Sequence, residues 1–173
     1  MKISISVNLM LVVLIASALA SGLLVRHNLM DMTDDGKIVN FSGKIRGGAQ
    51  RLVKLEFVKQ HQEADKVIGS IEKIINGILN GDTSLGIPKA DEDIFITEMK
   101  KVDSGWKKLR QHITEFRANP ALAEQLVKES EDFFKSTNEA TNVAEKLSVR
   151  HINTVYTVLI LIFILNLFIS ALV

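Results

Sequence analysis

The sequence contains no cysteine, only two prolines, one tyrosine and one tryptophan. The absence of cysteine excludes disulfide bonds, thiolate chemistry and cysteine-ligated metals. Few aromatic residues and few prolines, without any alternating strand pattern, favour an all-helical chain. Strong charge is lacking too, because the net charge is only +1. Nothing in the overall field of the protein therefore favours nucleic acid or an acidic partner.

Apolar residues are abundant, and they are concentrated at the two ends of the chain. Residues 7–25 form an uncharged run, and residues 156–173 form a second run with one notable polar residue, Asn166. Each run approaches the ~20 residues that a helix needs to cross a bilayer. The alternative for the first run is a signal peptide cleaved near Ala18-Leu19-Ala20. The run continues past that point to Val25, which favours a membrane span.

Two spans place both termini on one side of the membrane. We expect a two-pass protein of the bacterial inner membrane with its termini inside. The expected domains are an N-terminal transmembrane helix at residues 1–25, a periplasmic domain at residues 26–154 and a C-terminal transmembrane helix at residues 155–173.

The middle segment shows helical periodicity throughout. Helices are predicted over residues 31–61, over residues 64–80, from Asp91 or Asp93 onward, and after Asn119-Pro120 into the second span. The third helix has the most regular apolar seam, formed by Phe95, Met99, Val102, Trp106, Leu109, Ile113 and Phe116. Short loops between four helices predict an antiparallel up-down-up-down bundle between two transmembrane helices.

Residues 39–52 stand out within the first of these helices. Gly43, Gly47 and Gly48 interrupt a helical segment, although each interior glycine costs about 1 kcal/mol relative to alanine. We therefore expect close backbone approach to a partner helix. Two lines at three-four spacing run along this helix, so that one can face the core while the other faces something else: Ile38, Phe41, Ile45, Gly48, Leu52, Leu55; and Val39, Gly43, Arg46, Gln50, Val53, Phe57.

No enzymatic constellation is present in the sequence. The four histidines are scattered without metal-ligand spacing, and no phosphate-binding glycine loop follows a strand. We therefore predict no catalytic residues, no metal site and no cofactor.

Arg46 is the residue that we expect to bind a ligand. If the second line faces a twofold-related copy, two Arg46 side chains converge and repel each other. A small anion between them would convert this repulsion into charge-assisted hydrogen bonds. Small residues at Ser42, Gly43, Gly47 and Gly48 would leave room for that ligand and for helix contact. The alternative is that Arg46 lies on a solvated face and the glycines only permit tight packing.

The stretch from Asn40 to Leu52 resembles the periplasmic box of nitrate/nitrite sensor histidine kinases, N-x-A-G-x-x-R-M-x-S-x-R. It is even more similar to the related box of type IV pilus chemotaxis transducers, A-G-R-Q-R-M-L-S-Q-R. The matching positions are Gly43, Lys44, Arg46, Gln50 and Arg51.

This resemblance implies a periplasmic four-helix sensor domain that forms a parallel homodimer and binds nitrate or nitrite between two copies. It implies that Arg46 contacts the anion, that Gly43 lies near it, and that Asn40, Gln50 and Arg51 give support. The chain departs from the box at Gly47-Gly48, where the family has methionine and a larger residue, and at Ser42, which replaces alanine.

The predicted function is the input module of a membrane signal-transduction receptor that senses a small anion. Sensors of this kind continue into a HAMP helix pair and a kinase, chemoreceptor or cyclase module, whereas this sequence stops at Val173. Either the chain is a fragment of a longer sensor, or it signals through a separate partner. The alternative function is a structural membrane adaptor or anchor whose bundle docks a partner ectodomain without a small ligand.

Overall fold

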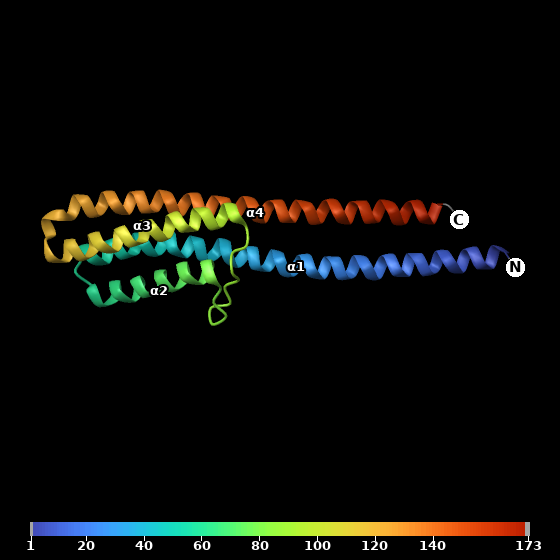
Figure 1. Cartoon of the computed structure of the whole chain (residues 1–173), viewed down its shortest axis with the longest axis horizontal. Coiled ribbons are helices and arrows are strands. Elements are labelled where there is room, and N and C mark those ends of the chain that lie inside the picture. Colours follow the sequence, from blue (N-terminus) through green and yellow to red (C-terminus); the bar gives the residue numbers. More distant parts are fainter. Residues whose placement is uncertain (1, 172–173) are drawn as a thin grey trace. The chain divides into compact units, whose positions relative to one another are not determined.

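The structure, a computed structural model, describes residues 2–171, and within that range the side chains of all but residues 2–6 and 9–10. The described chain forms α1 (Lys2–Phe57), α2 (His61–Asn80), α3 (Asp93–Ala118) and α4 (Ala123–Ala171), with the short 3-10 helix η1 (Pro120–Leu122) before α4 (Figure 1). No strand occurs in this part of the chain, and its one isolated bridge joins Asp82 to Ile87. The prediction of an all-α chain with four helices is confirmed.

The chain divides into two compact units by its internal contacts. One unit runs from Asp34 to Leu147, and we call it the helical unit. The other combines the chain ends, up to Thr33 and from Ser148 onward, and we call it the terminal unit. Both α1 and α4 contribute to each unit.

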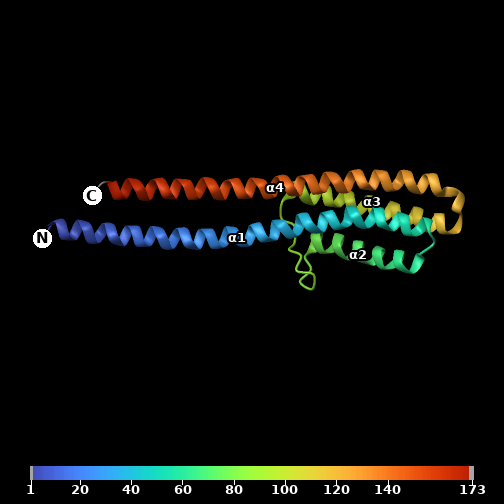
Figure 2. The ribbon, with the colours of Figure 1, turned by 180° about the vertical axis from the view of Figure 1, so that it is seen from behind.

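The helical unit is built around one apolar core. The segments of all four helices in this unit lie side by side in both views (Figures 1 and 2). All seven seam residues predicted for α3 are buried, which confirms that pattern. The isoleucines of α2 face the same core: Ile68, Ile71, Ile74, Ile75 and Ile78. Burial of these large apolar side chains is the main force that holds such a unit together.

The contribution of α1 to this core differs in part from the prediction. Ile45 and Leu52 are buried as expected, and Val53 from the second line is buried too. The structure also buries Ala49 and Glu56, which belong to neither predicted line. The buried stripe of α1 thus lies partly between the two lines that periodicity indicated. The helix continues without a break from the first apolar run and ends at Phe57, earlier than predicted.

The connection between α2 and α3 is an ordered loop held by Asp82. Its Oδ1 accepts from the backbone N–H of Ser84 at 2.8 Å and of Leu85 at 3.1 Å, and from the Ser84 hydroxyl at 2.6 Å. The hydrogen bond from the Ser84 side chain is the main reason why the pKa of Asp82 lies below its ordinary value. Helix α3 then starts at Asp93, one of the two predicted positions.

A buried carboxylate joins the ends of three helices. Glu56, near the end of α1, is fully buried and accepts from Arg117 of α3, whose Nε lies 2.9 Å from Oε2 and whose Nη2 lies 2.5 Å from Oε1. His61 Nδ1 at the start of α2 lies 3.0 Å from Glu56 Oε2, and Asp65 accepts from Arg117 at 2.7 Å. The hydrogen bond to Glu56 is the main cause that raises the pKa of Arg117 above its ordinary value.

The terminal unit consists of the apolar ends of α1 and α4. Each of these helices is long and apolar enough to cross a membrane. Ser17 of α1 donates from Oγ to Asn166 Oδ1 of α4 at 2.8 Å, which pairs the notable polar residue of the second run. Apolar side chains such as Leu23 and Phe168 are largely exposed. This combination fits an inner-membrane protein, in which lipid would cover those side chains.

Candidate functional site

The predicted site residues of α1 lie mostly on one outward face of the helical unit. At about 100° per residue, positions 40, 43, 46, 47 and 50 fall within a third of a turn of one another. Gly43 and Arg46 are half-buried, whereas Asn40, Gly47 and Gln50 are exposed. We call these five residues the Arg46 face. The structure therefore brings Arg46 together with two of the three glycines that the sequence singled out.

The guanidinium group of Arg46 is held by the side-chain amide of Asn138. Its Nη1 donates to Oδ1 of Asn138 on α4 at 2.8 Å. Among the described residues no carboxylate forms an ion pair with Arg46, in contrast to Arg110 and Arg117. A neutral partner orients the guanidinium group without neutralising it, so its remaining N–H donors and its charge are available to an anion.

The glycines of this stretch have two different environments. A Cβ atom built at Gly43 or Gly47 would meet nothing within 4 Å, so open space lies beside both positions. A Cβ atom at Gly48 would lie 3.2 Å from Cδ1 and Cγ1 of Ile71 on α2. The predicted close approach to a partner helix is thus present at Gly48, and that partner is α2 of the same chain.

Ser42 and Arg51 lie away from the Arg46 face. Ser42 is buried, and its Oγ has no hydrogen-bond partner among the described residues. Arg51 is exposed. Its charge contributes to the lowered pKa of Glu63, although the hydrogen bond from Lys66 is the larger cause. Ser42 therefore lies behind the face, and Arg51 lies beside it.

No metal centre is apparent in the described part of the chain, where no group of three or more histidine, cysteine, aspartate or glutamate side chains could hold an ion. Three of the four histidines pair with separate carboxylates. His27 contacts Asp31, His61 contacts Glu56, and His112 contacts Glu115.

Asn138 could not be identified as a site residue from the sequence. This residue lies 92 positions after Arg46, within a polar stretch of α4 that has no distinctive composition. Only the packing of α4 against α1 brings the two residues together. An indirect signal is the run of small residues in the same segment of α4, because buried Thr137, Ala140 and Ala144 let neighbouring helices approach.

The comparisons with known proteins identify the domain. The family PilJ, described as the N-terminal domain of type IV pili methyl-accepting chemotaxis transducers, matches residues 28–133. The match includes the whole Arg46 face and ends before Asn138. A search of curated proteins found no significant match. Because the family covers more than half of the sequence, the chain belongs to the PilJ family of chemotaxis transducer N-terminal domains.

Proposed function

We propose that the chain is the input module of a membrane chemotaxis transducer and that it senses a small anion, with nitrate and nitrite as the expected ligands. Membership of the family supports a sensory role, which is not catalytic. The observation that carries the ligand proposal is Arg46, a guanidinium group that is oriented by Asn138 and lacks a carboxylate partner. Planar oxyanions match the planar donor fork of arginine.

The proposed architecture follows from this role. Residues 1–25 and 155–173 span the inner membrane twice, and residues 26–154 form a periplasmic antiparallel four-helix bundle. The bundle pairs in parallel with a second copy through the Arg46 face, so that two Arg46 side chains bind one anion. Open space beside Gly43 and Gly47 supports this arrangement, because it lets a second helix approach closely. Ser42 lies beneath the ligand, while Asn40, Gln50 and Arg51 support the contact.

The proposed signal is a small shift of α1 against α4. Because Arg46 is bonded to Asn138, an anion that draws the guanidinium group toward a second copy weakens this link between the two helices. Piston or rotation movements of this kind are a common way to transmit binding. The recipient is an output module of a longer chain, such as a kinase or chemoreceptor domain, or a separate signalling partner.

Calorimetric titration of the full chain in lipid nanodiscs tests the ligand. We expect nitrate and nitrite to bind, and Arg46→Ala to remove the binding. Arg46→Lys is the matched control, because it keeps the charge but loses the donor fork, and we expect it to bind about tenfold more weakly. If neither anion binds, or if Arg46→Ala binds as well as the original chain, the ligand proposal is wrong.

A structural adaptor is the competing function, since open space at Gly43 and Gly47 would also admit a partner ectodomain. Crosslinking from a cysteine introduced at position 43 distinguishes the adaptor function from anion sensing. A contact between two copies that changes with nitrate supports sensing. A contact formed solely with another protein, unchanged by nitrate, supports the adaptor.

A further inference from the structure

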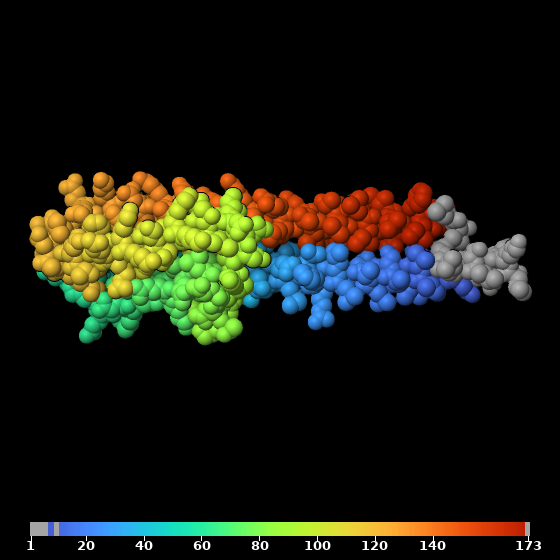
Figure 3. Space-filling model, in the orientation of Figure 1, coloured from blue at the N-terminus to red at the C-terminus, as the bar shows by residue number. Residues whose placement is uncertain are grey.

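A groove of about 560 Å³ lies between α2 and α3. These two helices lie next to each other on the face of the helical unit shown in Figure 3. Helix α2 contributes one stripe of residues: Glu72, Ile75, Asn76, Leu79 and Asn80. Helix α3 contributes Asp103, Trp106, Lys107 and Arg110. The volume is within the range of about 300–1,000 Å³ that is typical of small-molecule sites.

The groove contains a buried donor without an acceptor. Trp106 lines the groove and is only 3% exposed, and its ring packs against Phe133 with 5.6 Å between centroids. Its indole Nε1 has no hydrogen-bond partner in the described part of the chain. Nearly all buried polar groups in proteins are paired. The indole N–H is thus a donor that an acceptor bound in this groove would pair.

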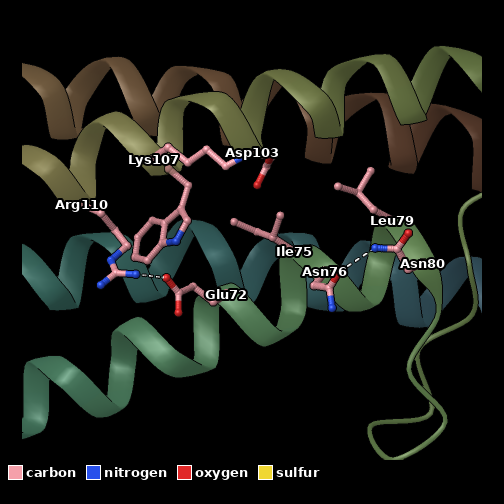
Figure 4. Close-up of a pocket in the computed structure, with 9 residues that line it drawn as sticks. Glu72, Ile75, Asn76, Leu79, Asn80, Asp103, Lys107 and Arg110 are labelled. Atoms are coloured by element: carbon pink, nitrogen blue, oxygen red, sulfur yellow. Dashed lines mark hydrogen bonds and ion pairs between the residues drawn. The ribbon is translucent and has the colours of Figure 1, made fainter.

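The charged side chains that line the groove are two cations and two anions. Arg110 is paired with Glu72 across the groove, and Lys107 Nζ lies 2.6 Å from Asp103 Oδ2 along α3 (Figure 4). All four side chains are at least one-third exposed. Exposed ion pairs of this kind are weak and open readily. A ligand that carries both a positive and a negative charge can thus replace the partners in these ion pairs. No charged side chain of the groove then lacks a partner.

We propose that this groove binds a free α-amino acid with an apolar side chain. The ligand carboxylate accepts from Arg110, from Lys107 and from the Trp106 indole N–H. The ligand ammonium group binds the carboxylates of Glu72 and Asp103. The apolar side chain packs on Ile75 and Leu79 of α2, and Leu79 lies beyond the charged side chains toward Asn80 (Figure 4).

The charge balance distinguishes this site from the Arg46 face. A lone anion would leave Glu72 and Asp103 unpaired beside it, and a lone cation would leave Arg110 and Lys107 unpaired. A zwitterion satisfies both signs at once. The groove also belongs to a different pair of helices, because Arg46 of α1 contacts α4. This inference therefore goes beyond the proposed anion sensing and does not depend on it.

Fluorescence titration tests the proposal, because Trp106 is the only tryptophan of the chain. The full chain in nanodiscs is titrated with L-leucine and with two probes that each lack one charge, 4-methylpentanoate and 3-methylbutylamine. We expect L-leucine to give a saturable change in tryptophan emission. Each of the two probes that lack one charge is expected to bind at least about tenfold more weakly. The proposal would be overturned if L-leucine gave no saturable change, or if a probe that lacks one charge bound as tightly as L-leucine.

Variants locate the binding and separate it from the Arg46 face. Arg110→Gln and Asp103→Asn are each expected to weaken L-leucine binding about tenfold. The matched control is Lys135→Gln, which removes one partner of an exposed ion pair with Asp132 on α4. Arg46→Ala is expected to bind L-leucine normally, and Arg110→Gln to bind nitrate normally. Unchanged L-leucine affinity in both groove variants would place the binding elsewhere.

Discussion

At the scale of single residues, a buried charged pair joins α1 and α3 in the helical unit. Glu56 is fully buried, and it is stabilised by two donors of Arg117 together with the contact from His61. A buried charge that loses its partner is costly, whereas the intact pair can be close to neutral in energy. The pair therefore acts mainly as a constraint on which helix ends can meet.

We predict that Arg117→Ala lowers the free energy of unfolding by about 3 kcal/mol, because it removes the two charge-assisted donors of the buried Glu56 carboxylate and leaves it with the contact from His61. Urea denaturation followed by Trp106 fluorescence measures the change. The control is the double variant Glu56→Leu with Arg117→Leu, which removes both charges and is expected to be much less destabilised. A loss in the double variant as large as in Arg117→Ala would contradict this explanation.

A second prediction concerns neighbouring glycines. Gly47→Ala is expected to stabilise the unit by about 1 kcal/mol, because alanine favours helix and open space surrounds the new methyl group. Gly48→Ala gains less, since its methyl group would crowd Ile71 at 3.2 Å. Denaturation of both variants gives the comparison. If copies pair through the Arg46 face, Gly47→Ala also reduces crosslinking between them, and unchanged crosslinking would argue against that pairing.

At the scale of elements, the predictability of each helix depends on what its buried residues are. The seam of α3 could be predicted completely because every buried position is a large apolar residue. The stripe of α1 could not, because Ser42, Ala49 and Glu56 are small or polar residues that carry no signal of burial. Periodicity reports hydrophobic residues and therefore misses a polar residue that is buried through a distant partner.

The candidate site also has one part that could be predicted from the sequence and one part that could not. The face that carries Gly43 and Arg46 follows from helical geometry, so it could be predicted from the spacing alone. The contact from Arg46 to Asn138 depends on how α4 packs against α1, which no local pattern encodes. The unpaired indole N–H of Trp106 could not be predicted for a related reason, because in the sequence this residue is one of several apolar residues along the seam of α3.

The loop between α2 and α3 is predicted to lose stability in acid. The pKa of Asp82 lies below its ordinary value of 3.8, chiefly because its carboxylate accepts from Ser84. This stabilisation is complete above pH 3.8 and is lost as the pH falls through the lower folded-state value. The melting temperature of Asp82→Asn should thus be lower than that of the original chain at neutral pH, and the difference should narrow in acid. A constant difference would contradict the assignment.

At the scale of the whole molecule, the proposed two-pass topology can be tested with unusual clarity because the chain has no cysteine. Single cysteines are introduced at Gln60, which is exposed between α1 and α2, and at Lys2. A maleimide that cannot cross the inner membrane is then added to cells whose outer membrane has been made permeable. We expect labelling at position 60 and none at position 2 until the cells are lysed. Labelling at both positions in intact cells would contradict two spans.

The cluster around Glu56 also has a consequence for how long the helical unit stays folded. Arg117 lies 61 positions after Glu56, so their contact closes a long loop and carries a large entropic barrier. Contacts of this kind are expected to form after the folding transition state. Their loss then speeds unfolding more than it slows refolding. In stopped-flow experiments Arg117→Ala should refold at nearly the original rate and unfold much faster, so the buried carboxylate sets the lifetime of the folded unit.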